Sequence, residues 1–303
     1  MFNLRHDIRF DKSHLNSWNS TLFGSYVNHL MDNLLKPLDP RMLNASTSAT
    51  TYNYGGRTEG FWTFGNNSLF SGLDFRREGA EGIRTREYLM GPNAGNTFYD
   101  NAWQDGHIAK GSLFAEFHLK KGQTQYVLST RLELNQANIN EATSEFKEIN
   151  QDNQVTQINP NLSAGATHKI NEKLNFGLWL GRAQRSASLT ERYINFFPVG
   201  QDPYELVGNP QLKPEVNNQF DIILDWKNKF TKLEVDVFAG YLQNFISSFI
   251  EPNTDPRLPN SPGVRQFTNI DNAIKTGFEI NWTQQLILGL QQQIGLAYTY
   301  AQD

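Results

Sequence analysis

The sequence contains no cysteine among its 303 residues, so this chain has neither disulfides nor thiolate metal ligands. It also has no run of eighteen or more apolar residues, which is the length that a transmembrane helix requires. The 27 Lys and Arg residues nearly balance the 31 Asp and Glu residues, and no basic stripe of the kind that binds nucleic acid is present. These absences exclude a membrane-spanning helix and argue against a nucleic-acid partner.

Signals for export and for catalysis are missing as well. Residues 1–7 have neither a basic start nor an apolar core, so they are not a signal peptide, and we expect either a protein that is not exported or part of a longer precursor. No Gly-x-Ser-x-Gly, His-Glu-x-x-His or Gly-x-x-x-x-Gly-Lys motif occurs, and no nucleophile can be named for a barrel lipase. The sequence therefore indicates a protein that is not an enzyme.

What the sequence does contain is alternation of apolar and polar residues. In residues 219–227, four apolar side chains fall on one face of an extended chain: Phe220, Ile222, Leu224 and Trp226. The intervening positions are mostly polar, and the same pattern recurs in 113–120, 126–135, 232–241 and 288–300. A period of two is typical of β-strands with one apolar face.

Counting such segments predicts roughly twelve strands and no helix. The expected strands are 4–12, 16–30, 45–65, 67–86, 107–121, 124–145, 155–170, 173–188, 217–228, 231–250, 266–286 and 288–302. Short turns are expected at 121–123, 171–173 and 228–230, and long loops at 87–106, 189–216 and 251–265.

These strands favour an antiparallel transmembrane β-barrel. Many exceed ten residues, whereas strands of soluble sandwiches average about five or six. Short turns that alternate with long polar loops are typical of the two sides of an outer-membrane barrel. Aromatic residues near strand ends are candidates for the girdles that flank its lipid-facing band: Trp62, Phe64, Trp103, Trp179, Phe196, Phe197, Trp226 and Trp282. A soluble β-sandwich, with these aromatics in its core, remains the alternative.

Residues 208–215 read Gly-Asn-Pro-Gln-Leu-Lys-Pro-Glu and lie between two of the expected strands. Prolines at such spacing fit any rigid extended loop. Three further pieces accompany this stretch: the strand that runs to Trp226, residues 267–279 with Phe-Thr-Asn-Ile-Asp-Asn-Ala and Gly-Phe-Glu, and the terminal Ala-Tyr-Thr-Tyr at 297–300. With these pieces, the sequence resembles the barrel of TonB-dependent outer-membrane receptors.

The resemblance implies a partial barrel. The family has a 22-stranded barrel closed by an N-terminal plug domain, so we expect residues 1–303 to be barrel without the plug, the TonB-binding segment or the last strands. It also implies a location in the outer membrane of a Gram-negative bacterium, contact with outer-membrane lipid, and energy supplied by the TonB-ExbB-ExbD complex. No cofactor is implied.

A second resemblance concerns the cargo. Residues 26–33 read Tyr-Val-Asn-His-Leu-Met-Asp-Asn and are similar to a strand of TonB-dependent copper receptors, in which a His-x-Met pair helps to bind copper. Here the pair is His29 and Met31, whose side chains share one face of a strand, and imidazole with a soft thioether suits copper. The resemblance implies that a plug segment of Cys-x-x-x-Met type supplies further ligands. The alternative is that His29 is an ordinary polar residue at a strand end and Met31 a packing residue.

Other candidate residues carry weaker signals. Met42 and Met90 could extend a methionine path for copper, although packing or surface roles are favoured. The lumen could be lined by four carboxylates, Asp221, Asp225, Glu234 and Asp236. No role is assigned to the scattered histidines His6, His14, His107, His118 and His168.

The copper-importing transporter therefore stands beside three alternatives. The first is a TonB-dependent transporter of a siderophore or a carbohydrate. The second is a passive porin or barrel adhesin, and the third is a soluble secreted β-sandwich with a binding surface.

Overall fold

Long antiparallel strands build almost the whole molecule. The computed structural model describes residues 1–11, 14–198 and 202–303. In these residues, twelve long strands are present: β1 (Phe2–Arg9), β2 (Leu15–Asp32), β3 (Leu43–Phe64), β4 (Asn67–Tyr88), β6 (Gly106–Lys121), β7 (Thr124–Ile139), β8 (Val155–Asn171), β9 (Leu174–Arg185), β12 (Glu215–Lys227), β13 (Thr231–Ile250), β14 (Val264–Gln285) and β15 (Gln291–Gln302). Three short strands accompany them: β5 (Thr97–Asn101), β10 (Asn195–Phe197) and β11 (Glu205–Val207).

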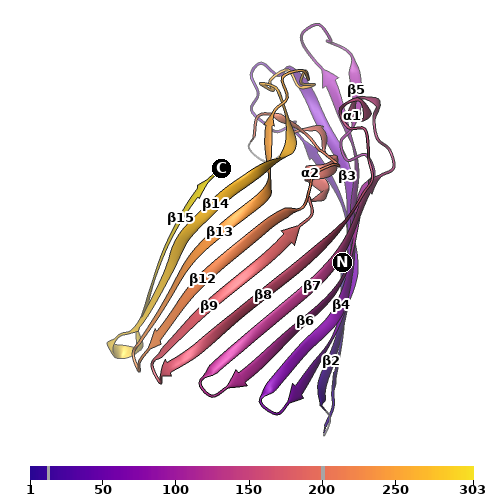
Figure 1. Cartoon of the computed structure of the whole chain (residues 1–303). Coiled ribbons are helices and arrows are strands. Elements are labelled where there is room, and N and C mark those ends of the chain that lie inside the picture. The colour runs from indigo at the N-terminus through magenta and orange to yellow at the C-terminus, as the bar shows by residue number, and fades with distance from the viewer. Residues whose placement is uncertain (12–13, 199–201) are drawn as a thin grey trace.

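The long strands form one curved sheet in which each pairs antiparallel with the next long strand along the chain (Figure 1). The short turns gather at one end of the sheet, and the long connections gather at the other, which we call the long-loop end (Figure 1). Gly122 shows why the turns are tight, because its φ of 60° lies in the left-handed region that favours glycine. Among the described residues, no helix is long and apolar enough to cross a bilayer.

All twelve expected strands are confirmed, and their ends differ by a few residues in most cases. The largest difference is at 124–145, where β7 ends at Ile139. Residue 12 of the expected strand 4–12 lies outside the described residues. The short strands β5, β10 and β11 fall inside expected loops. They form because loop segments pair with β4, with β14 and with each other.

The expectation of no helix is wrong. The structure contains α1 (Ser144–Ile149), α2 (Leu189–Tyr193) and a 3-10 turn, η1 (Ile287–Gly289). Local caps explain α1 and α2. The Thr143 side chain accepts a hydrogen bond from the backbone N–H of Phe146, and Ser188 and Glu191 form a reciprocal capping box. Helices this short show no readable 3.6-residue period, so the sequence pattern misses them.

The register gives the sheet two faces of different chemistry. Phe220 lies opposite Leu180 of β9 and Ala239 of β13, so the apolar positions of neighbouring strands share one face. Many of these side chains remain exposed, for example Leu180 at 61%. The other face carries Asp, Glu, Arg, Asn and Ser residues. We call the apolar face outward and the polar face lumenal.

The expected aromatic girdle is confirmed only in part. Trp62, Phe64, Trp226 and Trp282 lie on the outward face near the short turns, together with Trp18, which pairs with Gly60. Trp179 is wrongly placed in the girdle, because it lies opposite Asp221 and Gly165 on the lumenal face.

Three further girdle candidates, Trp103, Phe196 and Phe197, belong to the long-loop end instead. Phe196 is only 4% exposed, and the ring centroids of Trp103 and Phe197 lie 6.5 Å apart. They pack in a core built by α1, α2, β5, β10, β11 and the connection 251–263, which we call the loop cluster. Its centre consists of Phe146, Tyr193, Phe196, Val207 and Val264 packed against Ile108 of β6 and Ala137 of β7. We call the curved sheet of long strands the wall.

Candidate functional site

The two predicted metal ligands lie together on the lumenal face of β2. Val27, His29 and Met31 alternate with the outward residues Tyr26, Asn28 and Leu30. His29 lies opposite Ala49 of β3 and Met31 opposite Thr47, so no bulky side chain of β3 separates the pair. His29 is half-buried and Met31 is 39% exposed. Both side chains are thus on one face, near the long-loop end, and accessible to a ligand in the lumen.

The other candidate ligands lie elsewhere. Met42 and Met90 meet at the long-loop end, where the Met42 carbonyl accepts hydrogen bonds from the backbone N–H groups of Leu89 at 2.9 Å and Met90 at 3.2 Å. Within the described residues, no group of three or more His, Asp or Glu side chains is arranged to hold a metal ion. A metal site at His29 and Met31 would need at least one further donor beyond these two side chains.

The scattered histidines do not form a cluster. His14 stacks on Phe64 with 5.3 Å between ring centroids, and His118 contacts Glu116 at 2.6 Å on the lumenal face. His168 hydrogen-bonds Thr124 at 2.9 Å near a short turn. The sequence assigned these histidines no role, and each of these contacts involves a neighbouring side chain of the sheet.

Carboxylates line the lumenal face of β12, β13 and β14. The register places Asp225 directly opposite Glu234, and Asp236 directly opposite Glu279. Glu234 is compensated by Lys232 at 2.6 Å, whereas the Oδ1 atom of Asp236 is buried without a hydrogen-bond partner. Like charges directly opposite one another destabilise a sheet unless a cation compensates them.

The sequence pattern predicted three of these carboxylates and also Asp221, which lies on the same face, but it missed Glu279. The signal was available, because Glu279 alternates with the outward residues Phe278 and Ile280. Its lumenal side therefore follows from the same period of two.

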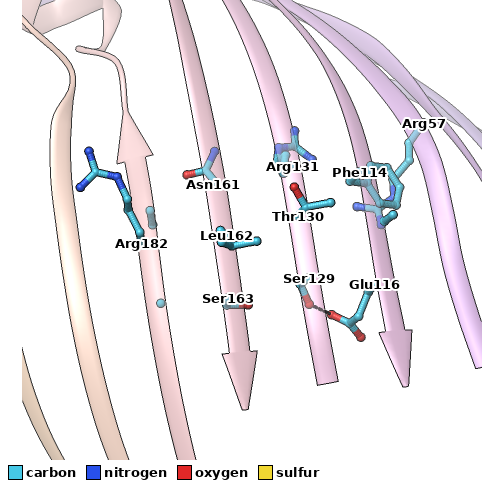
Figure 2. A pocket seen from close by; sticks show the side chains of 13 residues that line it. Arg57, Phe114, Glu116, Ser129, Thr130, Arg131, Asn161, Leu162, Ser163 and Arg182 are labelled. Atoms are coloured by element: carbon cyan, nitrogen blue, oxygen red, sulfur yellow. Dashed lines mark hydrogen bonds between the residues drawn. The ribbon is translucent and has the colours of Figure 1, made fainter. Parts of the chain in front are cut away.

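Another part of the lumenal wall combines aromatic and cationic groups (Figure 2). The guanidinium of Arg57 lies 4.3 Å from the centroid of the Phe114 ring, and that of Arg131 lies 5.9 Å from it. Arg131 is held by two hydrogen bonds to Asp74, at 2.7 and 2.8 Å. These groups border a shallow hollow of about 290 Å³. The arrangement suits anionic or aromatic ligands through charge and cation–π contacts.

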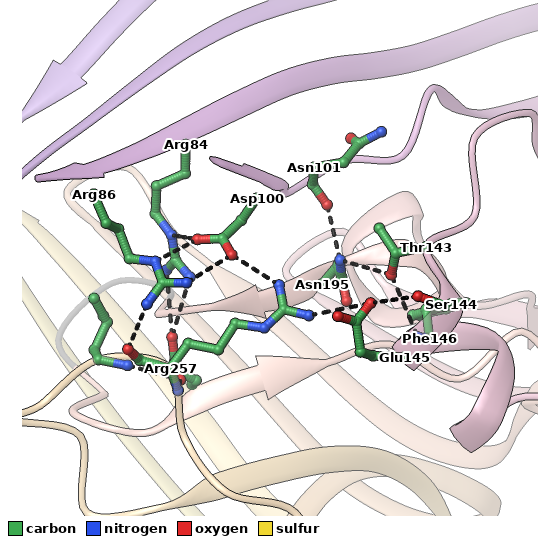
Figure 3. Close-up of polar contacts among 12 residues, drawn as sticks. Arg84, Arg86, Asp100, Asn101, Thr143, Ser144, Glu145, Phe146, Asn195 and Arg257 are labelled. Atoms are coloured by element: carbon green, nitrogen blue, oxygen red, sulfur yellow. Dashed lines mark hydrogen bonds and ion pairs between the residues drawn. The ribbon is translucent and has the colours of Figure 1, made fainter. Parts of the chain in front are cut away.

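A buried ion network joins the wall to the loop cluster (Figure 3). Asp100 of β5 accepts hydrogen bonds from Arg84 at 3.0 Å, from Arg86 at 2.6 Å and from Arg257 at 3.1 Å. Glu205 of β11 accepts from Arg84 at 3.3 Å and from the backbone N–H of Arg257 at 2.5 Å. Residues more than a hundred positions apart in the sequence thus fasten the loop cluster to β4.

The pKa values of the two carboxylates in this network are shifted in opposite directions. Burial disfavours the charge of Asp100, but hydrogen bonds and charges from Arg86 and Arg84 outweigh burial and hold the pKa of Asp100 below its usual value. For Glu205, burial raises the pKa above its usual value, and Arg84 with two backbone N–H groups offsets this only in part.

The 208–215 stretch has a structural role at the base of the loop cluster. A Cβ atom at Gly208 would lie 2.3 Å from the backbone of Arg192, so only glycine permits this approach. The buried Arg192 donates to the carbonyl of Pro210 at 2.6 Å, and Asn209 donates to the carbonyl of Phe267 at 3.1 Å. The stretch therefore fixes α2 to β14, and β12 begins at Glu215, close to the expected position.

Comparisons with known proteins agree with this architecture. The family model "TonB dependent receptor-like, beta-barrel" matches residues 1–303. Among solved structures, the fold is similar to "Copper transporter OprC", with a TM-score of 0.78 and 17% identity over 99% of this chain and 46% of that chain. It is also similar to "ferric citrate transporter FecA in the unliganded form" (TM-score 0.67, 12% identity, 99% and 42% covered).

A further similar structure is "The FrpB iron transporter from Neisseria meningitidis (F3-3 variant)", with a TM-score of 0.61 and 10% identity over 99% of this chain and 43% of that chain. The chain thus spans about half the length of these receptors. No curated protein sequence matches it. At these identities, the likeness to solved structures concerns the fold.

Proposed function

Because the chain belongs to the TonB-dependent receptor β-barrel family, we propose that it forms part of the wall of a transporter that imports copper across the outer membrane. The barrel lies in the outer membrane of a Gram-negative bacterium, and its family consists of transporters and receptors rather than enzymes. The proposal includes a plug domain within the complete receptor and energy delivered by TonB with ExbB and ExbD. The long-loop end then faces the outside of the cell.

The observation that carries the copper proposal is the placement of His29 and Met31. Both side chains lie on the lumenal face of β2, two residues apart, near the extracellular end. Imidazole nitrogen and thioether sulfur are donors that favour copper over calcium or magnesium. A thioether also binds without losing a proton, so half of this donor pair is independent of pH. The copper transporter OprC among the similar structures agrees with this cargo.

The charge of the lumen supports a cationic cargo. The carboxylates of β12, β13 and β14 give this wall a negative potential, which raises the local concentration of cations. In the proposed mechanism, copper enters from the extracellular side and binds His29, Met31 and ligands of the plug. Displacement of the plug by TonB removes the ligands that belong to the plug. The ion is then released toward the periplasm.

A second candidate function is uptake of a ferric siderophore. The observation in its favour is the lumenal surface of Arg57, Phe114 and Arg131, which suits anionic and aromatic chelators. FecA and FrpB among the similar structures are iron transporters. The siderophore candidate and the copper candidate depend on different residues of the wall. Mutations at one set of residues can therefore test one function without affecting the other.

Copper titration of the complete receptor tests the proposal. Replacing both His29→Ala and Met31→Ala should weaken copper binding by about a hundredfold, because the change removes both donors that this strand supplies to the proposed site. The matched control is His168→Ala with Met90→Ala, which removes the same residue types elsewhere and should leave the affinity unchanged.

Equal copper affinity in the two double variants would overturn the copper proposal. In that case, a ferric siderophore should bind, and Arg57→Ala with Arg131→Ala should weaken its binding. Failure of both ligands to bind would leave neither proposal standing.

A further inference from the structure

The apolar part of the outward face of the wall carries two charged side chains among the described residues, both of them arginines. This face is apolar between the short turns and the level of the tyrosines Tyr54 and Tyr241. Within this band of the described strands, the charged side chains are Arg77 of β4 and Arg182 of β9, and neither Asp nor Glu occurs there. A charge in a lipid-facing band is unfavourable unless it lies at the boundary or has a partner.

Both arginines lie at the outer boundary of the membrane. Arg77 follows Asn67, the first residue of β4, by ten positions, and Arg182 follows Leu174, the first residue of β9, by eight. Tyr241 similarly follows Thr231 by ten. A tilted strand crosses the apolar core of a bilayer in about 9–11 residues. The two guanidinium groups therefore reach the headgroup region of the extracellular leaflet, at the level of the tyrosines.

Neither arginine has an acidic partner in the described residues. The side chain of Arg77 makes no hydrogen bond or ion pair within the described residues. The side chain of Arg182 donates a hydrogen bond of 2.8 Å to the amide oxygen of Asn218. Lumenal arginines behave differently, because Arg76 pairs with Glu78 at 2.6 Å and Arg131 with Asp74 at 2.7 Å. The outward guanidinium groups thus have donors free for an anion that comes from outside the protein.

Each arginine borders a groove on the outward face. One groove, of about 840 Å³, is lined by Arg77 with Tyr26, Tyr52 and Tyr54. The other, of about 760 Å³, is lined by Arg182 and by apolar side chains such as Leu180 and Phe220. A cation at the headgroup level above an apolar groove fits a lipid whose phosphate lies at the boundary and whose acyl chains lie below.

We propose that Arg77 and Arg182 bind the phosphate groups of phosphorylated glycolipid molecules in the extracellular leaflet, with acyl chains in the two grooves. Guanidinium recognises phosphate through paired, charge-assisted hydrogen bonds, and the neighbouring tyrosine hydroxyls can donate to the same headgroup. This inference rests on the outer-membrane location and the outward face. It is independent of the cargo.

Binding of diphosphoryl lipid A to the complete receptor tests the inference. The receptor is placed in nanodiscs of zwitterionic lipid, and bound lipid A is counted by native mass spectrometry. Arg77→Ala and Arg182→Ala should each weaken binding at its own groove about fivefold, and the double variant should weaken binding at both grooves about fivefold. Arg77→Lys should recover part of the loss. The control is Arg76→Ala, which removes the same charge one residue away on the lumenal face and should leave binding unchanged.

The probes also distinguish headgroup recognition from simple filling of the grooves. Phosphatidylethanolamine should not compete with diphosphoryl lipid A at equal concentration. The proposal is overturned if the outward double variant binds lipid A as tightly as Arg76→Ala does, or if phosphatidylethanolamine competes equally.

Discussion

The loop cluster and the wall of the barrel obey different physical rules. In the loop cluster, side chains such as Phe146 and Tyr193 are fully buried, and charges are paired across segments distant in sequence. The wall is one sheet thick, and large apolar residues such as Leu162, at 55%, remain exposed. The cluster is stabilised by packing as in a soluble protein. The wall is stabilised by strand pairing and by contact with lipid.

This difference predicts how each region tolerates change. In the cluster, removal of one charge leaves its partners buried and unpaired, because little water can reach them. In the wall, the outcome depends on the face of the sheet on which a residue lies. Substitutions that violate neither rule should have small effects in both regions.

The largest effect is expected from Asp100→Asn in the loop cluster. The change leaves Arg84, Arg86 and Arg257 without the charge of their shared acceptor, and it should cost about 3–5 kcal/mol of stability. The measurement is urea unfolding of the complete receptor, together with proteolysis of the loops. Glu172→Gln is the control, because Glu172 pairs with Lys169 in full solvent. Equal behaviour of the two variants would show that the buried network does not hold the cluster.

A smaller effect is expected from a charge on the wall. Leu128→Arg places a cation on the outward face of β7 and should cost about 2–4 kcal/mol near the middle of the bilayer. Val127→Arg, one residue away on the lumenal face, should cost almost nothing. Urea titrations in lipid vesicles compare the two. If both variants lose the same stability, the assignment of the faces is wrong.

The smallest effect is expected for the pH dependence of the loop cluster's stability. The lowered pKa of Asp100 means that its stabilisation is complete above the ordinary value near 4 and is lost as the pH falls through the folded pKa. The raised pKa of Glu205 means that its stabilisation is complete below its ordinary value and is lost as the pH rises through the folded pKa. The cluster should therefore be most stable at mildly acidic pH.

Urea midpoints measured from about pH 3 to about pH 8 test this expectation. Glu205→Gln should remove the decline on the alkaline side and keep the decline on the acidic side. A profile of this variant identical to that of the unaltered receptor would contradict the assignment to Glu205.

The sequence predicts the wall well because the wall depends on local alternation. Twelve strands, the short turns and the shared face of His29 and Met31 all follow from a period of two. The same rule would have placed Trp179 on the lumenal face, since it lies between the outward residues Leu178 and Leu180. Its assignment to a girdle came from residue type alone.

The loop cluster could not be predicted in this way. Arg84 and Glu205 are 121 residues apart, and nothing in either neighbourhood indicates their contact. The short strands β10 and β11 form by pairing with each other and with β14, and the sequence does not show such partners. The role of His29 and Met31 as ligands stays a prediction.

Diffraction at the copper absorption edge, from crystals of the complete receptor grown with copper, tests the central claim most directly. We expect one strong anomalous peak on the lumenal side of β2, at bonding distance from an imidazole nitrogen of His29 and from the sulfur of Met31. The peak should vanish in the double variant His29→Ala with Met31→Ala. A copper peak elsewhere in the lumen, with none at this pair, would contradict the account.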